Sequence, residues 1–409
     1  MSDRRYQIAL FVLQKLICIP STIGSLMIIS QVCRSEFNRT KTQQRLILGI
    51  SIIDFQTSIV WVFTNFFLPS STPMGIATLG NQNSCDAQGF LVQFSTAGFL
   101  YVCALQLHYL LIIKHGWKNS RIEAIEKWFH LVPIVFGTVT ATAALVLEQY
   151  NPADWDCWIA PFPRGCTASD CVRGINADYY RFAFFFGPLW VAIIFCIIVM
   201  FRIYRSVRKV ENKSKMWSAS KWISMSLVND KPKKRPKQKC PQHKVTDKVK
   251  MQSIMYASAF LIVWIFPTIT RIIQISEGTV HPIFVVLSGT FIGSQGIFNA
   301  IIYFRPRYTQ CEAYDRWDQK VLVLVRSTLF PCCDSNADYT KDDKDYVNGS
   351  QNNTNAGLSV SNDCCKVRND NVNDEEKQEE ECAINSTQST LDKGNALNEN
   401  PISESQGQE

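Results

Sequence analysis

Seven long apolar segments constrain this chain more than any other feature. A helix needs about 20 mostly apolar residues to cross the roughly 30 Å hydrocarbon layer of a bilayer. The segments that meet this length are residues 7–32, 45–68, 86–113, 128–147, 179–204, 251–275 and 280–304. The sequence therefore predicts an all-α integral membrane protein whose transmembrane domain, residues 7–304, is a bundle of seven helices.

The segments that flank this domain are polar. Residues 334–409 hold 6 Lys or Arg and 17 Asp or Glu, and such a segment cannot bury enough apolar surface to offset its chain entropy. We expect a disordered acidic tail there, a short amino-terminal segment at 1–6 and an amphipathic juxtamembrane segment at 305–333. Arg305 and Arg307 mark the membrane exit, and Pro306 is predicted to break the last helix.

The positions of the cations predict the orientation, because Lys and Arg in short loops are retained on the cytoplasmic side. The loops after the first, third and fifth spans are basic, and residues 202–250 hold 16 Lys or Arg against 3 acidic residues. The segments 69–84 and 276–279 contain no Lys or Arg. We therefore expect a multi-pass plasma-membrane protein with its amino terminus outside, and with its carboxyl terminus and a long basic third loop, 205–250, inside.

Four of the 15 cysteines fall in the predicted outer segments, where the oxidising side of a membrane preserves disulfides. Cys85 opens the third span, and Cys157, Cys166 and Cys171 lie in the loop after the fourth span. We expect one bond from Cys85 to this loop and a second bond between the two remaining loop cysteines. The sequence leaves the pairing open.

Motifs in three of the spans resemble one group of receptors. Segment 295–303, QGIFNAIIY, is similar to the seventh helix of the slime-mould cyclic-AMP-receptor-like and secretin-like receptors. Segment 264–267, WIFP, followed by Arg271, resembles the sixth helix of the cyclic-AMP receptors, and segment 107–111, LHYLL, resembles the third helix of secretin-like receptors. Rhodopsin-like receptors are a poorer match, because the third span lacks their Asp-Arg-Tyr motif. Over residues 7–307 the chain thus resembles a G-protein-coupled receptor.

Polar side chains within the spans are expected to face the bundle interior, because an unpaired amide or carboxylate in lipid is costly. We predict that Asp54, Gln295, Asn299 and Tyr303 form a switch network, with static hydrogen bonding between helices as the alternative. In the receptors that the chain resembles, outward movement of the sixth helix opens the inner face to a G protein. That resemblance makes Pro267 and Gly296 candidate hinges, with simple packing geometry as the alternative.

The outer ends of the spans hold two candidate ligand-binding cations. Arg181 and Arg271 would suit an anionic group, and the alternative is that they reach lipid headgroups or pair with Asp178 or Glu277. Trp264 is a third ligand candidate, with core packing as its alternative. The short amino-terminal segment favours a small extracellular ligand, which the two arginines suggest is anionic, in the helix bundle. We expect neither a cofactor nor a nucleic acid.

The inner surface is predicted to contact membrane lipids and a heterotrimeric G protein, because cations attract anionic headgroups and acidic partners. The alternative is that these cations only set the topology. Cys332 and Cys333 are candidate palmitoylation sites. The candidates for G-protein coupling are His108, Lys114, Arg205, Arg208, Lys209, Lys248 and Lys250.

Other classes of seven-helix protein fit less well. A retinal protein would carry a Schiff-base Lys in the last span, and residues 280–304 contain no Lys. The five His are scattered along the chain, which argues against a metal hydrolase, and we predict that the chain is not an enzyme. A membrane transporter or a non-signalling scaffold remains the alternative to a receptor, although a transporter usually shows inverted repeats.

Overall fold

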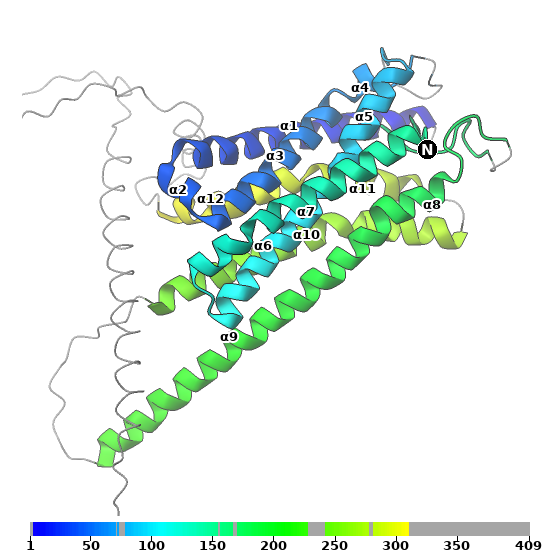
Figure 1. Cartoon of the computed structure of the whole chain (residues 1–409). Helices are drawn as coiled ribbons and strands as arrows, with labels where there is room; N and C mark the ends of the chain where they lie inside the picture. The colour runs from blue at the N-terminus through cyan, green and yellow to red at the C-terminus, as the bar shows by residue number, and fades with distance from the viewer. Residues whose placement is uncertain are drawn as a thin grey trace, which may run out of the picture.

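The computed structural model shows long helices packed side by side (Figure 1). It describes residues 3–70, 72, 78–153, 156–166, 170–227, 242–277 and 281–310, and within these ranges the side chains of 8–206, 208 and 250–306. Within these residues, seven helices are long and apolar enough to cross a membrane, which confirms the predicted fold class. Residues 311–333 of the juxtamembrane segment and the acidic tail at 334–409 lie outside the described residues.

The first two spans pack against each other. They are α1 (Asp3–Arg34) and α3 (Thr42–Val62), joined by the short helix α2 (Glu36–Thr40), and α3 is followed by the single turn α4 (Thr64–Phe67). Lys15 of α1 donates to the backbone carbonyl of Val62. This contact satisfies a carbonyl at the end of α3 that has no partner within the helix.

The third span lies at the centre of the bundle. It consists of α5 (Gln82–Phe94) and α6 (Thr96–His115), separated at Ser95, whose hydroxyl donates to the Val92 carbonyl at 2.6 Å. The fourth span is α7 (Asn119–Val146). Because α6 packs against α3, α7 and both of the next two spans, most of its apolar side chains belong to the core.

The fifth span contains one irregular turn. It begins as α8 (Ala177–Arg181), passes through the π-helical turn η1 (Phe182–Phe186) and continues as α9 (Gly187–Leu227). The sixth span is α10 (Gln242–Glu277). Residues 205–227 and 242–250, which we predicted as parts of an inner loop, are therefore helical, since the polar residues there still favour a helix that extends beyond the apolar span.

The seventh span is broken at Ser294, between α11 (Pro282–Gly293) and α12 (Gln295–Gln310). The prediction that Pro306 breaks the last helix is wrong, because α12 continues through it. A proline removes one helical hydrogen bond, here the bond to the Ile302 carbonyl. The loss of one bond does not end α12.

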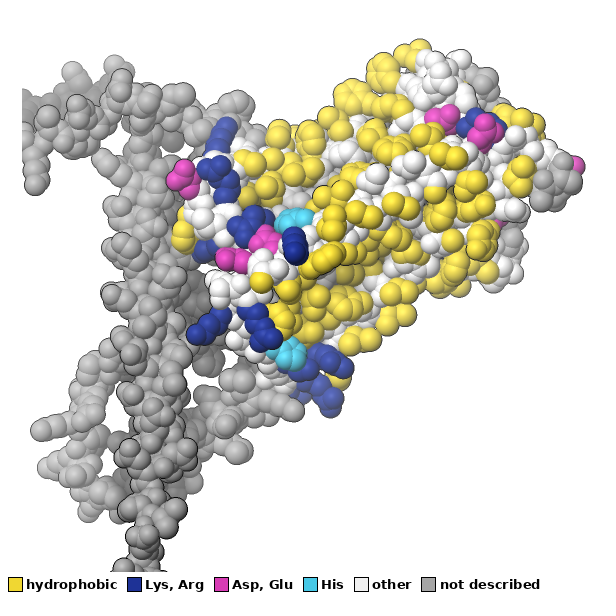
Figure 2. All heavy atoms as spheres, viewed as in Figure 1, with side chains coloured by type: hydrophobic (Ala, Val, Ile, Leu, Met, Phe, Trp, Pro, Cys, Tyr) yellow, Lys and Arg dark blue, Asp and Glu magenta, His cyan; other side chains and the backbone are white. Residues whose placement is uncertain are grey.

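The two ends of the bundle differ in chemistry. An antiparallel hairpin, β1 (Tyr150–Pro152) and β2 (Cys157–Ile159), lies with both disulfides at what we call the disulfide end. Figure 2 shows hydrophobic side chains covering the sides of the bundle and Lys and Arg side chains gathered mainly at the opposite end, which we call the basic end. Among the exposed apolar side chains are Trp128, Val139, Phe201 and Ile301.

Candidate functional site

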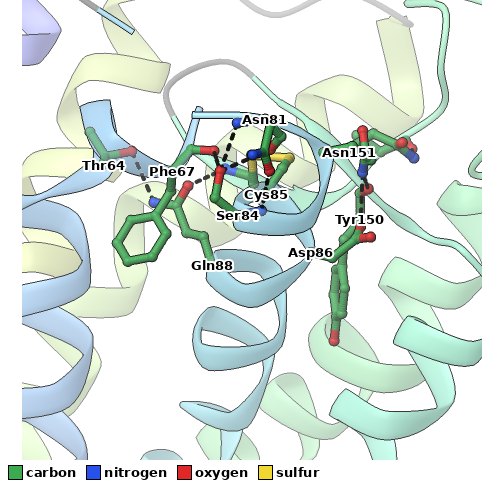
Figure 3. Close-up of a disulfide and its surroundings, with 12 residues drawn as sticks. Thr64, Phe67, Asn81, Ser84, Cys85, Asp86, Gln88, Tyr150 and Asn151 are labelled. Atoms are coloured by element: carbon green, nitrogen blue, oxygen red, sulfur yellow. Dashed lines mark hydrogen bonds between the residues drawn. A yellow bond between two sulfur atoms is a disulfide. The ribbon is translucent and has the colours of Figure 1, made fainter. Parts of the chain in front are cut away.

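A disulfide attaches the hairpin to the helix bundle (Figure 3). Cys85 at the start of α5 bonds to Cys157 of β2, and Cys166 bonds to Cys171 within the loop that follows. The expectation of one bond from Cys85 to this loop and one bond between the two remaining cysteines is confirmed, and the structure supplies the pairing. The fully buried Gln88 accepts from the Cys157 backbone N–H at 2.9 Å. These contacts fix the hairpin over the end of the bundle.

The local sequence explains how α5 and the hairpin meet. Asn81 caps α5 by accepting from the Ser84 N–H at 3.0 Å, and the Ser84 hydroxyl donates to the Phe67 carbonyl at 2.8 Å. Tyr150 of β1 lies so close to Gly89 that an added Cβ would be 2.4 Å from its ring. Burial raises the pKa of the Tyr150 phenol. This tyrosine therefore acts as a neutral packing group.

Beneath the hairpin lies a cavity of about 480 Å³, lined by residues of α3, α5, α6, α8, η1, α10, α11 and α12. Its volume falls in the range of small-molecule sites. Asp156 and Trp158 of the hairpin segment line it at the disulfide end, and Asp54 and Gln295 line it deeper in the bundle. Trp158 is held in place by a hydrogen bond from its ring N–H to Gln93 Oε1 at 3.0 Å.

Aromatic rings line the middle of this cavity. The ring centroids of Trp158 and Phe185 are 4.9 Å apart, and those of Phe185 and Trp264 are 5.6 Å apart. Phe185 and Phe186 both come from the π-helical turn, an element that is frequent at functional sites because it changes the helical register. Trp264, a predicted ligand residue, thus lies in the cavity wall.

The two predicted ligand-binding arginines both line the cavity. Arg181 donates to the Ile159 carbonyl at 2.6 and 3.0 Å and pairs with Asp178 at 3.4 Å. Arg271, only 5% exposed, pairs with Asp178 at 3.1 Å and donates to Gln274 at 2.7 Å. The structure thus shows the pairing with Asp178 that we considered as the alternative, and it also brings both cations to one site.

At the inner end of the cavity, three of the predicted switch residues form one hydrogen-bonded chain. Asn299 of α12 donates to the Asp54 carboxylate of α3 at 2.6 Å, and Gln295 donates to Asn299 Oδ1 at 3.3 Å. Tyr303 lies one turn further along α12, and Pro267 lines the cavity on α10. These hydrogen bonds tie the second span to the seventh. The role of the three residues as a switch stays a prediction.

The coupling candidates at the basic end do not all reach the surface. His108 is 3% exposed and packs inside the bundle, because it lies on the face of α6 that meets the core. Lys114, Arg205 and Arg208 are exposed, and Lys250 is half-buried. The side chains of Lys209 and Lys248 and all of Cys332 and Cys333 lie outside the part that the structure describes.

Sequence reasoning missed a set of neutral hydrogen bonds near the basic end. Gln106 of α6 donates to the Ser253 carbonyl of α10 at 3.1 Å and accepts from its hydroxyl at 3.0 Å. Gln43 of α3 donates to Gln252 of α10 at 2.9 Å and to Tyr109 at 3.2 Å. These bonds hold the sixth span to the second and third. An amide at position 106 within an apolar run is the signal that would have revealed the contact.

A charged cluster joins the second and fourth spans near the basic end. The Glu126 carboxylate of α7 accepts from Arg45 Nε and Nη2, both at 2.5 Å, and from the Thr42 hydroxyl at 2.8 Å. Its side chain is 12% exposed, whereas that of Arg45 is 31% exposed. The pair therefore retains some solvent screening, which weakens its Coulomb attraction.

Replacing Glu126 with Gln is expected to lower the free energy of unfolding by about 1–2 kcal/mol, because Arg45 keeps its charge and loses its counter-ion. Thermal unfolding of the purified chain measures this effect. Glu123→Gln, at an exposed position on the same helix, is the control and should change stability by less than about 0.5 kcal/mol. Equal effects of the two substitutions would contradict a specific role for the Arg45 pair.

Comparison with known proteins finds relatives in sequence and in fold. No family model matches the chain. The ascaroside receptor GPR3 of Arthrobotrys oligospora is 23% identical over 328 residues, which cover 63% of this chain and 74% of the relative. Cyclic AMP receptor-like protein F of Dictyostelium discoideum is 23% identical over 186 residues, 46% of this chain and 48% of that protein.

Among solved structures, squid rhodopsin superposes with a TM-score of 0.53 at 14% identity, covering 86% of this chain and 91% of that one. The chain has the seven-helix fold of this structure and is similar in sequence to proteins named as receptors. The likeness to squid rhodopsin concerns the fold, whereas the sequence similarity includes a cyclic-AMP-receptor-like protein, the group that the motifs indicated. The chain is thus a multi-pass membrane protein whose cavity lies among the helices.

Proposed function

We propose that this receptor binds a small extracellular ligand in the cavity at the plasma membrane and activates a heterotrimeric G protein. The extent of the cavity carries the proposal. It reaches from Arg271 under the hairpin to Asp54, whose partner Asn299 links the second and seventh spans. A ligand in this space would contact the outer cations and the inner hydrogen-bonded chain together, so it could favour one arrangement of the helices over another.

The named relatives support a signalling role rather than catalysis. One is named as an ascaroside receptor and the other as a cyclic AMP receptor-like protein. Both names fit a small ligand, and neither describes an enzyme. The Arg181 and Arg271 side chains support an anionic group on the ligand of this chain.

We infer that the sixth span transmits the signal. Pro267 interrupts the hydrogen bonding of α10, because it cannot donate to the Val263 carbonyl. The part of α10 that lines the cavity, from Phe260 to Gln274, extends on both sides of this point, and Ser253 contacts Gln106 nearer the basic end. A ligand that shifts α10 about Pro267 would weaken the contacts at the basic end. The exposed cations Lys114, Arg205 and Arg208 would then border the G-protein site.

Nucleotide exchange on a panel of purified G-protein α subunits tests the proposal. Membranes that contain the receptor should stimulate exchange on at least one subunit above empty membranes. Asn299→Ala removes the donor to Asp54 and should raise ligand-independent exchange severalfold, whereas Ile301→Ala, at a lipid-facing position with 59% exposure, should not. Absence of exchange with every subunit would favour a transporter or a scaffold.

A further inference from the structure

We propose that the cavity binds an elongated amphiphile in one orientation, with a carboxylate at the disulfide end, a hydroxyl donor at the inner end and an apolar chain between them. This inference rests on the proposed ligand cavity and specifies the chemistry of its ligand. Arg271 and Phe260 of α10 both line the cavity and lie eleven positions apart. At 1.5 Å per residue, this separation gives a depth of about 16 Å.

Arg271, which lines the outer end of the cavity, has an unused hydrogen-bond donor. Arg271 is 5% exposed, and its Nη atoms donate to Gln274 and Asp178. Among the described residues, nothing accepts from its Nε atom. A buried guanidinium N–H without an acceptor is costly, and a carboxylate oxygen is the acceptor that matches its geometry. The outer end therefore favours an anionic group on the ligand.

Three other charged side chains lie near this outer end, and they differ in the hydrogen bonds that they already make. Arg181 already donates to the Ile159 carbonyl and to Asp178. Asp156 accepts from the Trp61 ring N–H at 3.3 Å on the α3 side. The Asp178 side chain is 74% exposed, so water can replace it at Arg271. A ligand carboxylate would compete with Asp178 for this arginine.

The inner end has the opposite polarity. Because Asn299 donates to Asp54, its carbonyl oxygen faces Gln295 and accepts from it. Gln295 Oε1 is then left with no donor among the described residues. The nearby hydroxyls of Thr57 and Ser58 already donate within the protein, so they offer lone pairs. This end therefore favours a ligand group that donates a hydrogen bond, such as a hydroxyl.

The apolar middle and the two ends together define the orientation. Phe99, Phe185 and Trp264 line the space between the ends and favour an alkyl or other apolar segment. In the reverse orientation a ligand carboxylate would face the Asp54 carboxylate and the free Gln295 oxygen, and repulsion between these acceptors would disfavour it.

Binding to the full chain in lipid nanodiscs tests the orientation without a G protein. The probes are ω-hydroxydecanoate, decanoate and decanediol with a hydroxyl at each end, and the readout is quenching of tryptophan fluorescence relative to empty nanodiscs. We expect ω-hydroxydecanoate to bind at least tenfold more tightly than the diol and severalfold more tightly than decanoate. Equal affinities for the hydroxyacid and the diol would overturn the inference.

Three substitutions test where the carboxylate and the hydroxyl of the ligand bind in the cavity. Arg271→Met should weaken binding of both acids about tenfold and leave the diol unchanged. Gln295→Leu should remove the preference for ω-hydroxydecanoate over decanoate. Asp178→Asn, at an exposed side chain where folding is not at risk, should strengthen acid binding severalfold because a competing carboxylate is lost. Acid binding that none of these substitutions changes would overturn the inference.

The exchange assay separates this inference from the proposed function. Charge-dependent binding of ω-hydroxydecanoate without nucleotide exchange on any α subunit would support the ligand chemistry and contradict the receptor function. Exchange driven by the diol as strongly as by the hydroxyacid would support the receptor function and overturn the ligand chemistry.

Discussion

Replacing Gly296 with Ala is expected to destabilise the folded bundle by about 3 kcal/mol. A Cβ atom at this position would lie 2.5 Å from the hydroxyls of Ser21 and Ser25 and 2.7 Å from the Ser21 carbonyl oxygen. The hydroxyls can rotate, but the carbonyl belongs to the backbone of α1, so α12 must move away. Such overpacking typically costs about 1–3 kcal/mol. The movement also lengthens the hydrogen bond from the Gly296 N–H to Ser21, now 3.1 Å.

Thermal unfolding of the purified full chain measures this loss, with Gly98→Ala as the matched control. An added Cβ at Gly98 would lie 3.2 Å from Ile53 Cγ2, the end of a side chain that can move. The higher helix propensity of Ala offsets that contact by up to about 1 kcal/mol. If both substitutions lower the unfolding temperature equally, the close approach of α1 and α12 is not the reason that Gly296 is needed.

The sequence predicted the seven spans, because apolar length is a local property that the bilayer selects directly. It also predicted that Cys85 bonds to the loop after the fourth span, since only four cysteines fall in outer segments, but it left open which loop cysteine is the partner. It identified Asp54 and Asn299 as polar groups that need partners. Their direct contact joins positions 245 residues apart, and the geometry of that contact depends on how the helices pack.

Other features depend on tertiary packing and gave no local signal. The π-helical turn at 182–186 changes which aromatic rings face the cavity, and the apolar run FAFFF is equally compatible with a regular helix. The burial of His108 follows from the central position of α6. The cavity itself is enclosed by helices from distant parts of the chain, so its lining could not be listed before the bundle was known.

Replacing Gln106 with Met is expected to raise ligand-independent nucleotide exchange about thirtyfold. Gln106 is fully buried and makes two hydrogen bonds to Ser253, which is 1% exposed. Met keeps the volume but leaves the Ser253 carbonyl and hydroxyl without these partners, which costs the packed arrangement about 2 kcal/mol. If α10 moves away from α6 on activation, as we propose, these hydrogen bonds are absent from the active state, and the substitution does not destabilise that state. About 1.4 kcal/mol corresponds to a tenfold shift in population.

Two controls distinguish the loss of these hydrogen bonds from general destabilisation. Leu107→Met, at the neighbouring half-buried position on α6, changes a side chain to Met without removing a hydrogen bond and should leave exchange unchanged. Ser253→Ala removes only the hydroxyl bond and should raise exchange by less than Gln106→Met does. The contrary result is the same ligand-independent exchange in the Gln106→Met variant as in the unmodified receptor, with the response to ligand retained. That result would show that these bonds remain intact on activation. The sixth span would then have to move as one unit with α6, and Pro267 would have no role as a hinge between the cavity and the basic end.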